Sequence, residues 1–84
     1  MIFWRRYNGD YIVFQEKDGE YEAEYLRVDF NLFFRPETGE WVLRFYRKKT
    51  PTESEGGTCD SWDHKPSRDE VGASLEKYID TLTL

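Results

Sequence analysis

The first half of the chain alternates apolar and polar residues with a period of two, which is the pattern of half-buried β-strands. Residues 2–7 and 11–16 are rich in aromatic and β-branched side chains. Asn8-Gly9 between them suits a two-residue hairpin turn that needs positive φ at both positions. Asp18-Gly19 has the same character. The pattern therefore predicts a β-meander at the start of the chain.

Residues 20–34 form a longer run, in which the apolar parity slips between Tyr25 and Leu26. A strand keeps strict period two, so the slip predicts a β-bulge or a strong bend. Residues 35–39 contain the proline and the glycine of a tight turn, and residues 41–49 read as the last strand. The expected meander has four strands, or five if the long run breaks.

Residues 50–66 are expected to be an irregular loop, because two prolines and a Gly-Gly pair interrupt a polar stretch. A helix over residues 67–82 follows. Ser67 and Glu70 have the spacing of a capping box, in which each side chain accepts a hydrogen bond from the backbone amide of the other residue. Apolar residues then recur at helical spacing at Val71, Leu75, Tyr78, Ile79 and Leu82.

These elements predict one α+β domain over residues 1–84, with an antiparallel β-meander (1–49), a loop (50–66) and a C-terminal helix (67–82) packed on one sheet face. The residues assigned to the covered face are Trp4, Ile12, Phe14, Leu26, Val28, Phe30, Trp41, Leu43 and Phe45. One helix shields one side only. The opposite side is therefore expected to expose Phe3, Arg5, Tyr7, Tyr11, Val13, Arg44, Tyr46 and Lys48.

That exposed side is the first candidate interaction surface, because it combines aromatic rings with cations. The partner-binding residues expected from it are Arg5, Tyr7, Arg44, Tyr46 and Lys48, together with Trp62 in the loop. Exposed apolar patches on small proteins often mark protein docking sites. The same residue types could stack on a single-stranded nucleic acid, or form an ordinary solvated sheet face.

Segment 59–64 gathers the chain's only cysteine and only histidine. A structural zinc ion needs four nitrogen or sulfur ligands, and a nucleophilic thiol needs a base with an orienting group. Cys59 and His64 supply neither set. We therefore expect no catalytic residue, no cofactor and no metal, and keep a thiol-dependent enzyme or sensor as an alternative.

Composition narrows the class of partner. The net charge is −5, and the excess acid lies in residues 50–84, whereas residues 1–49 are balanced. Phosphate binding favours the opposite sign. No apolar run approaches the ~20 residues of a membrane span, and a small domain with a lone cysteine suits the reducing cytoplasm. We expect a cytoplasmic protein that does not contact a membrane.

The function expected from the sequence is a small non-enzymatic protein that binds a protein partner through the exposed sheet face, the acidic helix or the Trp62 loop. An ordered array of carboxylates can mimic a nucleic acid, as in small phage-encoded inhibitors such as anti-CRISPR proteins. This analogy rests on size and charge alone. The leading hypothesis is thus an inhibitor or adaptor from a phage or mobile element. Self-association as a homodimer is a close variant, and a single-stranded nucleic-acid-binding module is the alternative.

Overall fold

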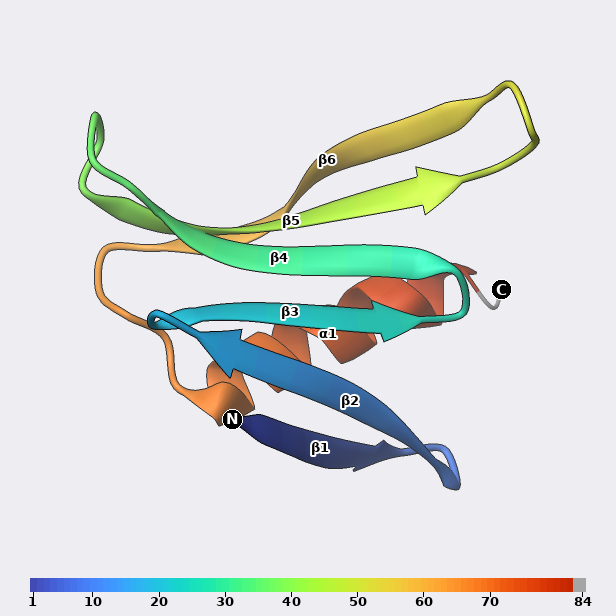
Figure 1. Cartoon of the computed structure of the whole chain (residues 1–84), viewed down its shortest axis with the longest axis horizontal. Coiled ribbons are helices and arrows are strands. Elements are labelled where there is room, and N and C mark those ends of the chain that lie inside the picture. The colour runs from blue at the N-terminus through green and yellow to red at the C-terminus, as the bar shows by residue number, and fades with distance from the viewer. Residues whose placement is uncertain (83–84) are drawn as a thin grey trace.

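The computed structural model describes residues 1–82 as an antiparallel sheet with one C-terminal helix, which confirms the α+β class. The strands are β1 (Ile2–Tyr7), β2 (Asp10–Lys17), β3 (Glu20–Tyr25), β4 (Val28–Arg35), β5 (Glu40–Lys48) and β6 (Ser54–Trp62), and the helix is α1 (Arg68–Leu82). Every strand pairs with its neighbours in chain order, so β1 and β6 are the two edges of the sheet. Figure 1 shows the sheet in front and α1 behind it.

The first two hairpin turns form as the sequence predicts. Asn8 and Gly9 have φ of 49° and 76°, and Asp18 and Gly19 have φ of 54° and 80°. These positive angles give the turn a twist that matches the right-handed twist of the flanking strands. Each turn fixes the register of its hairpin, and Tyr7 therefore pairs directly with Asp10.

The parity slip after Tyr25 is a third hairpin turn, where the sequence predicted a bulge or a bend. Leu26 and Arg27 have φ of 51° and 64°, and Tyr25 pairs with Val28 across them. Neither side chain favours this left-handed region, which costs about 1–2 kcal/mol for a residue with a β-carbon. The turn contains no residue typical of such a hairpin, so residues 20–34 read as one run in the sequence although they form the two strands β3 and β4.

Strand β6 corrects the prediction that residues 50–66 are irregular, and with it the strand count rises to six. The strand pairs with β5 along its length, with an irregularity in register opposite Leu43 and Arg44. Its Gly-Gly pair reads as a loop signal, yet Gly57 lies against the ring of Phe45. A β-carbon on Gly57 would come within 3.0 Å of that ring. Here glycine gives room for an aromatic ring on the neighbouring strand.

Helix α1 begins with the expected capping box. The Glu70 amide donates to the Ser67 hydroxyl (3.1 Å) and the Ser67 amide donates to the Glu70 carboxylate (3.0 Å). The apolar stripe of the helix packs on the sheet. The buried core is formed by Tyr7, Ile12, Phe14, Tyr21, Ala23, Val28, Phe30, Leu32, Leu43, Val71, Leu75 and Ile79.

The prediction of which β1 residues face the helix was wrong. Phe3 pairs with Phe14, and their rings stack at 4.9 Å on the helix side. Arg5 and Tyr7 share that side, whereas Trp4 pairs with Val13 on the other side and is 64% exposed. Directly opposed residues in a sheet point to the same face, so the Asn8-Gly9 turn fixes this parity. Leu26, also assigned to the core, lies exposed in its turn.

The Leu26-Arg27 turn yields a stability prediction. Replacement by Asn-Gly should raise the free energy of unfolding by about 1–2 kcal/mol, because both residues tolerate positive φ. Urea unfolding measures the change. The reciprocal control replaces Asn8-Gly9 by Leu-Arg, at a turn where a β-carbon on Gly9 would meet nothing within 4 Å. Its free energy of unfolding should fall by a similar amount, because only the backbone conformation disfavours the new residues. Equal stability of all three chains would contradict the argument.

Candidate functional site

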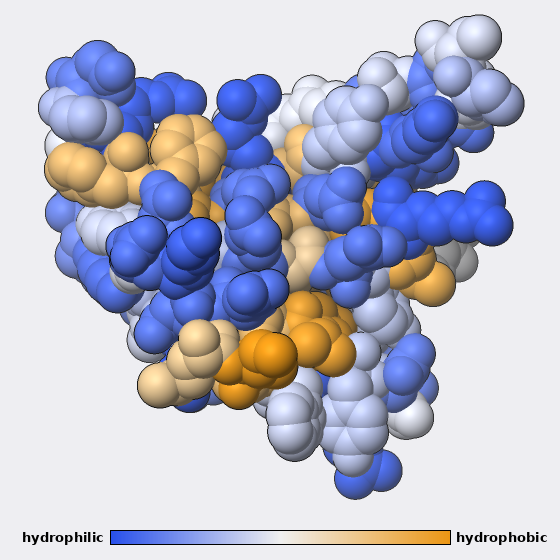
Figure 2. Space-filling model, viewed as in Figure 1, coloured by the Kyte–Doolittle hydropathy of each residue, from blue (hydrophilic) through white to orange (hydrophobic). Residues whose placement is uncertain are grey.

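The sheet face opposite α1, called the open face below, is a surface that the helix leaves uncovered. Its side chains lie in cross-strand rows. One row runs Ile2, Gln15, Glu22, Asn31, Arg44 and Thr58, and the next runs Trp4, Val13, Glu24, Asp29, Tyr46 and Gly56. Figure 2 shows apolar side chains over β1 and β2 on this face, with hydrophilic side chains across its middle.

Four residues form an apolar patch at the β1–β2 end of the open face: Ile2, Trp4, Tyr11 and Val13. Each is between 51% and 64% exposed. Trp4 and Val13 are directly opposed, and Tyr11 is paired with Arg6. Single exposed apolar residues are common, but four adjoining ones on two neighbouring strands form a continuous surface, which is the feature that marks docking sites.

Next to the apolar patch lies an acidic band formed by Glu22, Glu24 and Asp29. Glu24 and Asp29 are direct cross-strand partners, so two like charges oppose each other between β3 and β4. Such a pair destabilises a sheet by a few tenths to about 1 kcal/mol. In the structure Lys17 lies directly opposite Glu20 at the start of β3, whereas the direct neighbours of Glu22 are the uncharged Gln15 and Asn31.

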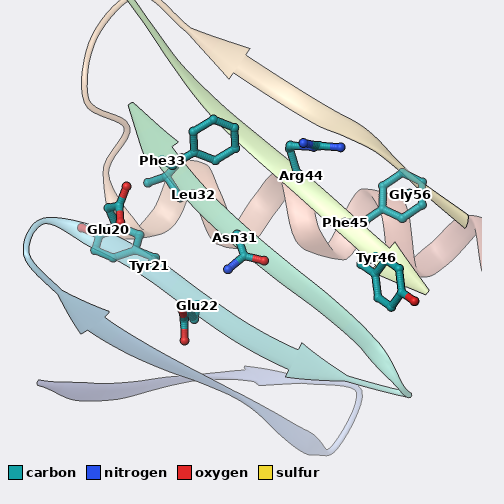
Figure 3. A pocket seen from close by; sticks show the side chains of 10 residues that line it. All are labelled: Glu20, Tyr21, Glu22, Asn31, Leu32, Phe33, Arg44, Phe45, Tyr46 and Gly56. Atoms are coloured by element: carbon teal, nitrogen blue, oxygen red, sulfur yellow. The ribbon is translucent and has the colours of Figure 1, made fainter. Parts of the chain in front are cut away.

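The far side of the open face carries the basic and aromatic residues of β5. Arg44 and Tyr46 border an open hollow of about 430 Å³, together with Asn31, Phe33 and Glu22. Figure 3 shows Glu22, Asn31 and Arg44 projecting from three neighbouring strands. The hollow therefore combines acid, amide and guanidinium groups. That mixture suits a polar rim around a protein contact better than a uniform phosphate site.

The structure brings Arg44, Tyr46 and Lys48 together on β5 of the open face, as expected, but it separates Arg5 from them. Arg5 points to the helix, where Nε lies 3.1 Å from Glu76 and Nη1 lies 3.4 Å from Asp69. The hydrogen bond that Arg5 donates to Glu76 is the main cause that raises the pKa of Arg5. Arg5 thus fastens β1 to α1 at the rim of the core.

Tyr7 is also on the helix side, where it is buried and its hydroxyl hydrogen-bonds to Asp80. That hydrogen bond is the main cause that raises the pKa of Tyr7 to about 12, with desolvation next. The neutral phenol is therefore favoured up to alkaline pH. The sequence-based prediction placed Arg5 and Tyr7 on the open face because it assigned alternate residues of β1 to the wrong sides of the sheet.

Trp62 belongs to the end of β6, where the sequence predicted a loop. It is paired with Trp41 of β5, and both are half-buried against the core. The ammonium group of Lys65 lies 5.6 Å from the Trp41 ring centroid and 5.7 Å from that of Tyr21. Cation–π contacts at this distance hold the connection to α1 against the sheet. Trp62 therefore lies away from Arg44 and Tyr46, on the helix side.

Cys59 and His64 occupy unrelated environments. Burial, followed by the charge of Asp60, raises the pKa of the Cys59 thiol to about 11, so thiolate is scarce at neutral pH. His64 lies between Asp63 (3.0 Å) and Glu70 (3.2 Å) beside the helix cap. Within residues 1–82, no three Cys, His, Asp or Glu side chains cluster as a metal site would require. This arrangement offers no activated nucleophile.

The chain matches no known family, curated protein or solved structure in comparisons with family models, curated sequences and structures. In the described part of the chain, no helix is long and apolar enough to cross a membrane.

Several residues of the open face were not predicted from the sequence, among them Ile2, Trp4, Glu24 and Asp29. A signal for Trp4 was present, because the two-residue turn at Asn8-Gly9 places it opposite Val13. The opposition of Glu24 and Asp29 had no such signal. It depends on the hidden turn after Tyr25, which alone sets the register of β3 against β4.

Gly72 tests how Arg5 holds the helix. A β-carbon on Gly72 would lie 2.5 Å from Arg5 Cδ, so glycine leaves space for the guanidinium to reach Glu76. In a helix, a Gly→Ala substitution ordinarily raises the free energy of unfolding by about 1 kcal/mol. We expect Gly72→Ala to give this stabilisation in an Arg5→Ala background but not in the wild type. The coupling should be about 1 kcal/mol in a double-mutant cycle by urea unfolding, and additive changes would contradict the proposed contact.

His64 predicts a pH dependence of stability. The hydrogen bonds that His64 makes to the carboxylates of Asp63 and then Glu70 raise the pKa of His64 above its ordinary 6.5 in the folded chain. The folded state therefore binds the proton more tightly, and this stabilisation is complete below pH 6.5 and lost as pH rises through the folded pKa. The difference in unfolding free energy between wild type and His64→Gln should shrink from pH 5.5 to 8.5. A difference independent of pH would refute the assignment.

Proposed function

We propose that this chain is a non-enzymatic protein-binding module that docks a protein partner on its open face. The observation that carries the proposal is the apolar patch beside the acidic band, both on a surface that α1 does not cover. The partner fitting this surface presents apolar side chains to Trp4 and Val13 and cationic side chains to Glu24 and Asp29. An inhibitor or adaptor role, as encoded by phages or mobile elements, is one setting for such a module.

The chemistry of the patch supports a protein as the partner. Trp and Tyr are the residues that most often supply large binding energies at protein interfaces, and a polar rim keeps water from the central contact. Trp4 and Tyr11 provide the rings, whereas the acids and Arg44 provide the rim. The net charge of −5 would also speed encounter with a basic partner.

The same face is a poor support for a single-stranded nucleic acid. Phosphates need a continuous basic track beside the stacking rings. Here Glu22, Glu24 and Asp29 lie between the rings of β1–β2 and the cations of β5. A strand crossing the sheet would therefore meet like charge at the centre, so we rank nucleic acid below protein.

A charge reversal tests the proposal without weakening the fold. Glu24→Lys would convert the like-charge pair with Asp29 into an ion pair, so the chain should become slightly more stable, by a few tenths of a kcal/mol. Its affinity for the basic partner should nevertheless fall at least tenfold. Val13→Glu should lower the affinity comparably by placing a charge in the apolar patch. The partner is captured from source cells, identified, purified and titrated by calorimetry.

The matched control is Ala73→Glu, which adds a charge on the exposed side of α1. It should bind like the wild type and leave folding unchanged. Equal affinity of all four chains would overturn the open face as the binding site. Co-purification of nucleic acid instead of protein, read as 260 nm absorbance that Arg44→Glu abolishes, would replace the proposal by its alternative.

A further inference from the structure

The outer edge of β1 has backbone groups without a strand beside them (Figure 1). Met1 and Glu16 exchange two backbone hydrogen bonds, of 2.7 and 3.0 Å. Such pairs alternate along an antiparallel ladder, so Phe3, Arg5 and Tyr7 point their backbone groups toward β2. The N–H and C=O groups of Ile2, Trp4 and Arg6 therefore point outward, away from the sheet.

The two edges of the sheet differ in how they discourage pairing with another strand. Edge β6 contains an irregularity in register opposite Leu43 and Arg44, and it carries Glu55 and Asp60. Bulges and charged side chains are common protections of an edge strand. Edge β1 also carries two charged residues, Arg5 and Arg6, but it pairs without irregularity over its six residues, and its Ile2 and Trp4 are 62% and 64% exposed. Because it contains no bulge, β1 is the less protected edge.

We propose that β1 pairs antiparallel with β1 of a second copy, with Trp4 opposite the partner's Trp4 on a twofold axis. In this register Ile2 lies opposite the partner's Arg6, and the outward backbone groups of all three residues are satisfied. The two Trp4 rings meet on the open face. Each Arg6 lies diagonally across from the partner's Trp4, within reach of a cation–π contact. The strand is thus complementary to itself.

Charge does not oppose this arrangement on the open face. The two Arg6 residues would be separated by four residues along the ladder, at roughly 3.4 Å each, and by the ~4.8 Å strand spacing, so their Cα atoms lie about 14 Å apart. That distance exceeds the Debye length of about 8 Å at physiological ionic strength. Repulsion between the two guanidinium groups is therefore largely screened.

Charge favours the arrangement on the helix side. Arg68 stacks 4.0 Å from the centroid of the Phe3 ring, and Phe3 would lie opposite the partner's Arg5. Arg5 is engaged by Asp69 and Glu76, and these three groups carry one net negative charge. The cationic Arg68 of each copy would therefore face an anionic cluster in the other copy. This complementarity selects a second copy as the occupant of the edge.

The dimer does not depend on the function proposed above, because β1 pairing uses the edge and leaves Tyr11 and Val13 open. It would join the apolar patches of both copies into one surface across the twofold axis. The contact is a single strand pair, smaller than the ~800 Å² per partner of a standard interface. We therefore expect a weak dimer with a dissociation constant in the micromolar range.

Trp4→Pro tests the pairing directly, because proline removes an N–H that points outward and leaves the hydrogen bonds to β2 in place. Sedimentation equilibrium from 10 to 500 µM should show a monomer–dimer equilibrium for the wild type and at least tenfold weaker association for Trp4→Pro. The matched variant Trp4→Val keeps the N–H and should retain more of the association. Near-UV circular dichroism establishes that both variants fold.

Hydrogen exchange of the wild type provides a reading that needs no substitution. The Trp4 and Arg6 amides should exchange quickly at low concentration and slow down as the dimer forms, whereas the Arg5 amide, bonded to β2, should be protected throughout. A monomer at 500 µM, or a dimer that Trp4→Pro leaves unchanged, would overturn the proposal. Protection of Trp4 by the captured protein alone would assign the edge to a foreign strand instead. Glu24→Lys should dimerise normally, so the two proposals can fail separately.

Discussion

The whole arrangement depends on one constraint: a single fifteen-residue helix can remove water from only one side of a six-stranded sheet. Val71, Leu75 and Ile79 are completely buried against that side. Burying such side chains stabilises the fold by roughly 1.5–3 kcal/mol each before conformational entropy is counted. The strand faces that meet α1 are therefore fixed by the core, whereas the open face is free to carry residues chosen for another purpose.

Strand β1 shows where the influence of the helix ends. Tyr7 is the one residue of β1 that is buried in the described structure, with 9% of its surface exposed, and Phe3 is held by stacking on Phe14. The other links to α1 are polar: the Tyr7 hydroxyl donates a hydrogen bond to Asp80, and Arg5 pairs with Asp69 and Glu76. An ion pair that is partly exposed contributes at most about 1 kcal/mol. β1 is thus attached by its ladder to β2 more than by burial. An edge held this way keeps its outer backbone groups accessible to another strand.

The sequence revealed every element whose local chemistry agrees with its final structure. Asn8-Gly9 and the Ser67 capping box are examples, because the residues that make these features also prefer them in isolation. The strands on either side of Leu26 were merged, since that turn is imposed by the pairing of the two strands against the preference of its residues. β6 was missed for a related reason. Its Gly57 makes room for the Phe45 ring on the neighbouring strand, and this contact between strands cannot be recognised from the local sequence.

The same distinction explains what could be known of the candidate site. An uncovered face with Arg44 and Tyr46 follows from strand parity and from the presence of only one helix. The apolar end of this face could have been predicted from the Asn8-Gly9 turn. A two-residue turn that pairs Tyr7 with Asp10 fixes the register of the whole hairpin, so it also pairs Trp4 with Val13 on the open face. The opposed acids of β3 and β4 required the hidden turn, so they became visible only in the folded chain.

Glu24 facing Asp29 is the observation that most favours the proposal that the open face binds a partner. A chain of this size has a small margin of stability, and a direct like-charge pair reduces it without benefit to the core. Nearly any neutral residue at Glu24 would relieve the repulsion at no cost in packing, because the side chain is exposed. Local conflicts of this kind are expected where a surface serves a function that folding alone does not require. A basic partner would neutralise the pair on docking, so the repulsion that weakens the free chain would become part of the affinity of the complex.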